Sequence, residues 1–475
     1  MASHFIFRNV VGVYILLCLG GCSPFSVPDR SGPPAGMPAA YSLDAALSVS
    51  PGQRWWEAFE APSLSGMIED ALADNLTLEA QRARLEKAGA LARQAESGSR
   101  PTLTGEAGVS HTESEGSAIT QDRRFSAGLV AGYEIDLWGR VHATRESAAL
   151  NAAATREDLD AAAMTVAAEV ARRWIGIVAR NQELDLLERQ LATNRTYLEL
   201  VELRFRTSLA TSLDVMQQRQ LVERIRARIP RVELQQRLLR NQLAVLTGRS
   251  PDALPAIGAT ILPEPEGPPA AGLPARLLEN RPDIRAARAR LEAADQELVA
   301  ARADLLPAIR LTGSATTSGR ELDRLLDNWL LNLAGSLTAP LLDGGRRKAQ
   351  VEAARATVRE RLALYRQTVL NALREVEDSL AQEDRIRSAI AATELQLEAA
   401  RSALAEARSR YVNGVNDYLP VLTQLLAVQN LEADLVTARE ELLAARISLY
   451  RSIGGTWTGT MIYETPDTER EDERS

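Results

Sequence analysis

The chain has 475 residues, of which 45% are hydrophobic and only 4% aromatic, and its formal net charge is −8 at pH 7. Alanine, leucine, arginine and glutamate dominate, a composition typical of long helices. The acidic balance and the lack of a basic stripe argue against a nucleic-acid-binding protein. The sequence has no phosphate-binding loop, no nucleophile motif and no cysteine cluster, so it predicts no enzyme, no cofactor and no metal site.

The first residues have the pattern of an export signal, in which Arg8 precedes a ten-residue apolar run that ends at Leu19. Ten residues of helix extend about 15 Å, which is too short to cross a bilayer. The run is followed by Gly20, Gly21 and Cys22, which resembles the bacterial lipobox. We predict a signal peptide over 1–21, lipidation of Cys22, and a tether and further segment over 22–63. A plain signal peptide with a coincidental cysteine is the alternative.

From residue 64 the chain contains two copies of one unit, 206 residues apart. The segment 82–86 (Arg-Ala-Arg-Leu-Glu) recurs at 288–292, and a glycine ends each copy. We predict copies over 64–248 and 275–454, with a proline-rich connector over 249–274 and a charged tail over 455–475. A period of this length indicates a duplicated structural unit rather than a solenoid repeat.

Each copy begins with a helical pattern and continues, after a proline, with period-two alternation that predicts strand hairpins over 102–133 and 308–338. Each strand has about ten residues, the length that a tilted membrane strand needs. The side chains predicted to face lipid are Phe125, Leu129, Ile309, Leu311, Trp329, Leu331 and Leu333. Two hairpins cannot close a barrel, and open edges are not tolerated in lipid. Either the hairpins are soluble and cover a core, or, as we favour, several chains close one barrel.

A helical run of unusual length follows each hairpin. The predicted long helices span 139–205 and 345–411, and the return helices span 211–247 and 418–452. About 65 residues make a rod of roughly 100 Å. Apolar residues recur every seven positions along both long helices, with Glu383 as the one charged exception. Such helices must pack against other helices. Pro230 predicts a kink in the first return helix.

Several motifs in this order resemble the signature of TolC-type outer-membrane efflux channels. They lie at 133–140, 280–287, 307–313, 340–346 and 410–422. Trp55, Trp56 and Phe59, together with the lipobox, resemble the lipidated OprM-like (NodT-type) branch. The resemblance implies an α+β membrane protein that forms a homotrimer. Four strands per chain would close a twelve-stranded outer-membrane β-barrel, continued by a periplasmic α-helical barrel. The connector and the terminal segments would form a mixed equatorial belt.

The resemblance also implies a function. The protein would be the exit duct of a tripartite efflux system in the outer membrane of a Gram-negative bacterium, surrounded by outer-membrane lipid. It would passively conduct small molecules received from an inner-membrane RND-type pump and a periplasmic membrane-fusion adaptor. The alternatives are an exit duct of type I protein secretion and a periplasmic coiled-coil structural lipoprotein.

The two turns between long and return helices would carry the periplasmic gate. Leu419 falls where OprM-like channels place a leucine ring, although it could instead pack against Leu213. Asp214 and Tyr411 fall where TolC-like proteins hold the tips together by a hydrogen bond. Asn416 replaces the arginine that would share this bond, so we expect a weaker lock.

Two further expectations concern the same turns. Pro420 and Thr423 occupy the positions of an acidic ring, so we expect no cation-binding ring at the aperture. The adaptor-contact tips would be Ser208, Leu209, Gly414 and Val415.

Overall fold

A computed structural model describes residues 25–28, 30, 37–42, 54–114, 120–264, 272–455 and 457–458. The predicted signal peptide and Cys22 lie outside the described residues, as does most of the tail. The chain forms two compact units. The first, here called the strand unit, comprises 1–32, 83–157 and 285–367. The second, the helical unit, comprises 33–82, 158–284 and 368–475. Each unit takes residues from both sequence copies.

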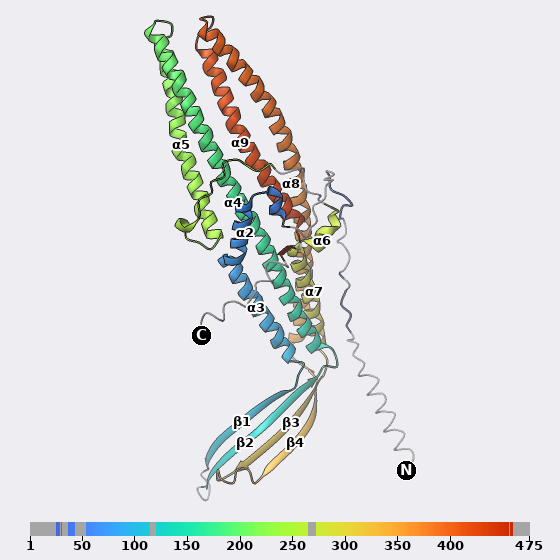
Figure 1. Ribbon diagram of the computed structural model, residues 1–475. Helices are drawn as coiled ribbons and strands as arrows, with labels where there is room; N and C mark the ends of the chain where they lie inside the picture. The colour runs from blue at the N-terminus through green and yellow to red at the C-terminus, as the bar shows by residue number, and fades with distance from the viewer. Residues whose placement is uncertain are drawn as a thin grey trace. The chain divides into compact units, whose positions relative to one another are not determined.

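The strand unit contains one antiparallel sheet in the order β1-β2-β3-β4 (Figure 1). The strands are β1 (Thr102–Ser114), β2 (Thr120–Ile135), β3 (Ala308–Gly319) and β4 (Trp329–Thr338). Each copy supplies one hairpin, and β2 pairs with β3 so that Glu134 lies opposite Arg310. The duplication therefore produces a single sheet in which the two copies are continuous.

The helices of the strand unit adjoin the sheet in sequence. They are α3 (Leu76–Ser97), α7 (Pro282–Ala303) and the first parts of α4 (Arg140–Arg206) and α8 (Arg346–Val412). Asp136 accepts hydrogen bonds from the N–H groups of Val141 and His142 at 3.0 and 2.7 Å, and so caps α4. Asp343 does the same for α8. The pKa of the Asp343 carboxyl is lowered, mainly by the hydrogen bond that it accepts from the backbone N–H of Arg347.

The helical unit holds the longest helices. Both α4 and α8 have 67 residues, and the return helices α5 (Ser212–Leu246) and α9 (Leu419–Ile453) have 35 each. Figure 1 shows α5 beside α4 and α9 beside α8. The core between the helices is apolar and includes Leu187, Val201, Leu221, Val421 and Leu425. None of the helices in the described part of the chain combines the length and apolar character of a membrane span.

The remaining elements of the helical unit are short. They are α2 (Pro62–Asp74), α6 (Leu277–Asn280) and the 3-10 helices η1 (Trp55–Phe59), η2 (Pro251–Ala253) and η3 (Pro274–Arg276). The aromatic residues that end the tether are buried: Trp55 stacks on Tyr450 at 5.5 Å, and Trp56 packs edge-on against Trp457 at 4.8 Å. These ring contacts join η1 to the C-terminal end of α9 and to Trp457, which follows it.

One detail differs from the sequence prediction. The helical run expected from residue 64 is broken at Asn75, whose Oδ1 accepts hydrogen bonds from Thr77 and Leu78 and starts a new helix. The amide of Asn75 also donates to the carbonyl of Leu246 at 2.8 Å, which ties the break to the end of α5. Pro230 lies inside α5, and the kink expected there stays a prediction.

Candidate functional site

The sheet has one apolar face. Residues paired across the strands share a face, so the register places all seven side chains predicted to face lipid on the same side. Leu129 is 52% exposed and Leu333 is 78% exposed, whereas Phe125 and Ile309 are half-buried. The opposite face carries Thr102, Thr104, Glu106, Ser126, Glu134, Arg310, Thr312 and Asn332. An exposed apolar face of this extent marks a surface that contacts lipid or protein.

The sheet also has two open edges. Among the residues that the structure describes, β1 pairs only with β2 and β4 only with β3. All ten residues of β4 are exposed. Each edge therefore presents a row of backbone N–H and C=O groups, which would need partners before the sheet could enter lipid. The two edge strands, β1 and β4, can therefore each pair with a further strand.

The two helical turns share one geometry. The N–H of Leu209 donates to the carbonyl of Arg204, and that of Val415 donates to Arg410, each at 2.8 Å. These are the long hydrogen bonds of a Schellman motif. The left-handed residue is Gly414 (φ 73°) in the second turn and Ser208 (φ 58°) in the first. The apices present Leu209 and Val415 to solvent.

The carboxylate of Asp214 is used inside its own helix. It accepts hydrogen bonds from the N–H and the hydroxyl of Thr211, each at 2.8 Å, and the Thr211 hydroxyl accepts from the N–H of Asp214 at 3.3 Å. This is a capping box. At the equivalent end of α9 the structure has Pro420 in the first turn and no side-chain cap.

Tyr411 is buried beside this cap, and burial raises the pKa of its hydroxyl. Its ring lies 4.4 Å from the guanidinium of Arg204 and 5.2 Å from the ring of Tyr418. In the described part of the chain the Tyr411 hydroxyl has no hydrogen-bond partner. Within one chain Tyr411 does not bond to Asp214, and both bonds from Thr211 go to Oδ2 of that carboxylate, which leaves Oδ1 for another donor. A bond between two protomers stays a prediction.

A buried series of hydrogen bonds joins the hairpin of α4 and α5 to that of α8 and α9, and the sequence analysis did not predict it. The hydroxyl of Tyr418 donates to Oε1 of Gln218 at 2.7 Å. The amide of Gln218 donates to the backbone and side-chain oxygens of Asn194 at 2.8 and 3.0 Å, and Asn194 donates to the carbonyl of Gln190. Burial raises the pKa of the Tyr418 hydroxyl. Asn194 and Gln218 stand at core positions of their helices, a signal that could have revealed them.

Leu419 and Leu213 are both exposed in one chain. The two residues occupy equivalent positions of the two copies, and they are 58% and 62% exposed, respectively. Met216 is exposed beside them. The start of each return helix therefore has an apolar surface that is exposed in one chain. Such a surface is expected where a residue contacts another protomer.

An open sheet with one apolar face, connected to helices of 67 residues, defines a membrane-channel protomer with a TolC-like fold. The chain belongs to the outer membrane efflux protein family, whose model matches residues 67–249 and 273–455. The two matches coincide with the two sequence copies. The resemblance inferred from the motifs is thus confirmed: the protein is an outer-membrane efflux channel, and it is not an enzyme.

Individual relatives agree over nearly the whole chain. The pyoverdine export outer membrane protein OpmQ of Pseudomonas aeruginosa is 32% identical, covering 95% of this chain and 97% of its own. The cation efflux system protein CusC of Escherichia coli is 28% identical, covering 93% and 97%. The solved structure of the outer-membrane channel OprN superposes with a TM-score of 0.85 at 26% identity, covering 92% of this chain and all of its own.

Proposed function

We propose that the chain acts as a homotrimeric exit duct of a tripartite efflux system. The observation that carries the proposal is the exposed apolar face of a sheet with two open edges. Water does not stabilise such a face, and lipid does not tolerate such edges. Three copies joined edge to edge satisfy both requirements, with the apolar face toward lipid and the polar face toward a water-filled lumen.

The helical turns are the surface for the periplasmic adaptor. The two turns have the same pattern of backbone hydrogen bonds, so their shape is fixed before a partner binds. Leu209 and Val415 are exposed at the apices beside Ser208 and Gly414. A rigid turn with an apolar apex suits a helical partner that packs an apolar stripe against it. An RND-type inner-membrane pump completes the system.

A contact made by the tether is consistent with a lipid anchor on Cys22. Arg30, eight residues further along the chain, forms a two-pronged ion pair with the buried Asp295 of α7, at 2.8 and 3.1 Å. Eight extended residues reach at most about 28 Å. A lipid anchor on Cys22 would thus be within reach of the strand unit, which also carries the apolar face. Acyl chains on Cys22 would enter the bilayer that surrounds the sheet.

The resting gate consists of Leu419 packed around the threefold axis, with the tips held by Asp214 and Tyr411 of neighbouring protomers. Support comes from the exposure of Leu419 in one chain and from the unpartnered hydroxyl of Tyr411. The absence of a carboxylate at Pro420 and Thr423 argues that no cation is held there.

The cargo is a small molecule. One relative is named for pyoverdine export and another for cation efflux, so channels of this family differ in cargo. Planar bilayers containing the purified protein test the channel, and ethidium efflux from cells that express it with a pump and adaptor tests the transport. Conductance together with efflux is expected. A trimer without conductance would indicate a structural lipoprotein, and secretion of a protein without ethidium efflux would indicate type I secretion.

A further inference from the structure

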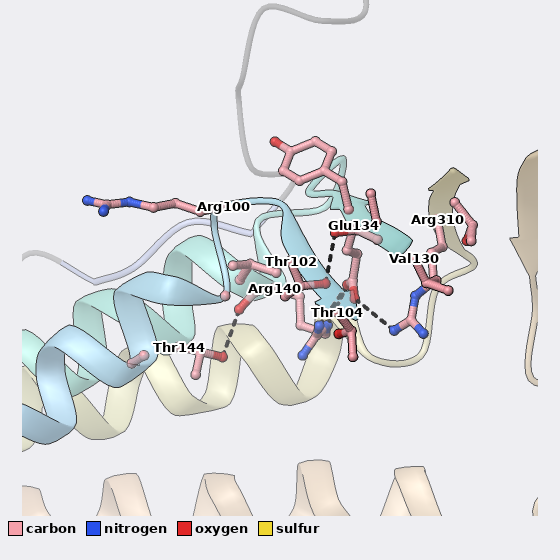
Figure 2. A pocket seen from close by; sticks show the side chains of 15 residues that line it. Arg100, Thr102, Thr104, Val130, Glu134, Arg140, Thr144 and Arg310 are labelled. Carbon is pink, nitrogen blue, oxygen red and sulfur yellow. Dashed lines mark hydrogen bonds and ion pairs between the residues drawn. The ribbon is translucent and has the colours of Figure 1, made fainter. Parts of the chain in front are cut away.

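A hollow of about 480 Å³ lies at the end of the sheet where the strands meet the helices (Figure 2). Its lining includes Thr102, Thr104 and Thr312, which the register places on the polar face. Three arginines line the hollow, from the turn before β1, the start of α4 and β3, against a single carboxylate. The charged lining residues are Arg100, Glu134, Arg140 and Arg310. We call this group the basic hollow.

Glu134 is shared unequally between two arginines. Its Oε1 accepts two hydrogen bonds from Arg140, at 2.7 and 3.1 Å, whereas its Oε2 lies 3.9 Å from Arg310. Figure 2 shows Glu134 between the two guanidinium groups. The carboxylate is thus neutralised by Arg140, and Arg310 contributes a charge that no close ion pair balances. The side chain of Arg310 is 67% exposed.

The other charges near the hollow do not cancel this excess. Arg100 is paired with Glu96 at 2.7 Å, outside the lining. Asp136 is used as the cap of α4, where it accepts hydrogen bonds from the N–H groups of Val141 and His142. Glu106, on the polar face, lies six residues along the strand from Arg100, or about 20 Å. Asp122, near the far end of the sheet, lies 3.0 Å from Arg320 and 3.7 Å from Arg124. Among the charged residues that line the hollow, Arg310 is therefore the one whose charge is not balanced by a close ion pair.

The arrangement suits an oxyanion. A guanidinium binds carboxylate, sulfate or phosphate through two parallel N–H bonds, and threonine hydroxyls add further donors. Charges of one sign on the wall of a narrow channel concentrate counter-ions in the adjacent water. In a closed trimer, three such hollows would surround the lumen at the level where the helices meet the barrel.

We propose that the basic hollow makes this channel favour anions and binds solutes that carry a carboxylate, sulfate or phosphate group, with Arg310 as the determining residue. The inference rests on the proposed function, because it requires the polar face to line a lumen. The pair is not duplicated within the chain: the residue equivalent to Arg310 in the first copy is Thr104, and that equivalent to Glu134 in the second copy is Pro340.

Reversal potentials of the full-length protein in planar bilayers, under a KCl gradient, test the selectivity. The wild type should pass chloride in preference to potassium. Arg310→Gln should raise the potassium-to-chloride permeability ratio by about twofold or more, since removing three charges changes the local potential by roughly the thermal energy. Glu134→Gln should shift the ratio in the opposite direction. Arg324→Gln, in the loop between β3 and β4, is the matched control and should not change it.

Inorganic triphosphate tests the binding. Added to the wild type, it should reduce the chloride current at lower concentration than in the Arg310→Gln variant. A wild type without conductance would contradict the proposed function itself. Conducting variants with unchanged reversal potentials and unchanged sensitivity to triphosphate would overturn this inference alone, since trimer content and single-channel current establish that the variants are assembled.

Discussion

The Tyr418 hydroxyl provides a sharp test of what holds the two helical hairpins together. Tyr418→Phe removes only this hydroxyl, which donates to Gln218 at 2.7 Å. Both side chains are buried, so Oε1 of Gln218 would lose its partner without access to water. An unsatisfied buried acceptor costs about 1–3 kcal/mol. Three copies would destabilise a trimer by roughly 3–9 kcal/mol if the copies act independently.

Tyr411→Phe is the matched control. Tyr411 is buried in the same cluster, 5.2 Å from the ring of Tyr418, but its hydroxyl has no partner within the described chain. Removing it leaves no buried acceptor unsatisfied within the chain, and the Asp214 carboxylate that the gate proposal pairs with it keeps its bonds to Thr211, so the loss of stability should be smaller than in Tyr418→Phe. Thermal unfolding of the purified trimer, followed by circular dichroism of the helices, measures both variants. Tyr418→Phe should melt several degrees lower than Tyr411→Phe.

The comparison has two informative failures. If Tyr411→Phe is as damaging as Tyr418→Phe, then the Tyr411 hydroxyl has a partner in another protomer, as the gate proposal requires for Asp214. If neither variant is destabilised, the buried series of hydrogen bonds contributes no net stability and the reasoning from unsatisfied acceptors is wrong. Single-channel conductance of Tyr418→Phe should also rise, because α9 would be less firmly held to α4 and α5.

Three further predictions follow from the sheet, the tips and the tether. Leu331→Arg should cost about 2–4 kcal/mol near the bilayer midplane, whereas Asn332→Arg on the polar face should be tolerated; urea titration in vesicles measures both, and equal damage would contradict the face assignment. Leu419→Ala should raise single-channel conductance beyond the double variant Asp214→Ala with Tyr411→Phe, and three unchanged conductances would place the gate elsewhere. Mass spectrometry should find acyl chains on Cys22; Cys22→Ser behind a non-lipoprotein signal should still form trimers, and an unmodified N-terminus at another residue would exclude lipidation.

The sheet was accessible to sequence reasoning because its pattern is local. Alternation with period two places Leu331 and Leu333 on one face whatever the partner strand is, and the register then brings Leu129 and Leu311 to the same face. The turns were accessible for a similar reason: a Schellman motif is built from six consecutive residues. Local patterns of this kind need no knowledge of distant contacts.

The interactions that join distant segments were not accessible. Gln218 meets Tyr418 across 200 residues, and Glu134 meets Arg310 across the junction of the two copies. Glu383 was visible as the charged exception in the heptad pattern, but its partner was not. The structure buries Glu383 against Arg446, with Nε at 2.9 Å from Oε2. A buried carboxylate requires such a partner, but the sequence does not say which arginine supplies it.

The two copies share their scaffold and differ where the channel would act. Gly248 and Gly454 both adopt positive φ, and an added Cβ would meet the carbonyl oxygen of Asp74 at 2.4 Å and of Asn280 at 2.6 Å, respectively. Asp74 and Asn280 are themselves equivalent positions, so the same close approach ends both return helices. A side chain at either position would clash with the neighbouring backbone, so both copies keep glycine there.

The tips and the basic hollow have diverged instead. Asp214 is matched by Pro420, Phe205 by Tyr411, Ser212 by Tyr418 and Thr104 by Arg310. In a trimer of duplicated chains the backbone repeats six times around the axis, but these side chains repeat only three times. The proposed lock takes its acceptor, Asp214, from the first copy and its donor, Tyr411, from the second, so it depends on the difference between the copies. We therefore expect substitutions that make the copies alike at these positions to affect gating and selectivity more than assembly.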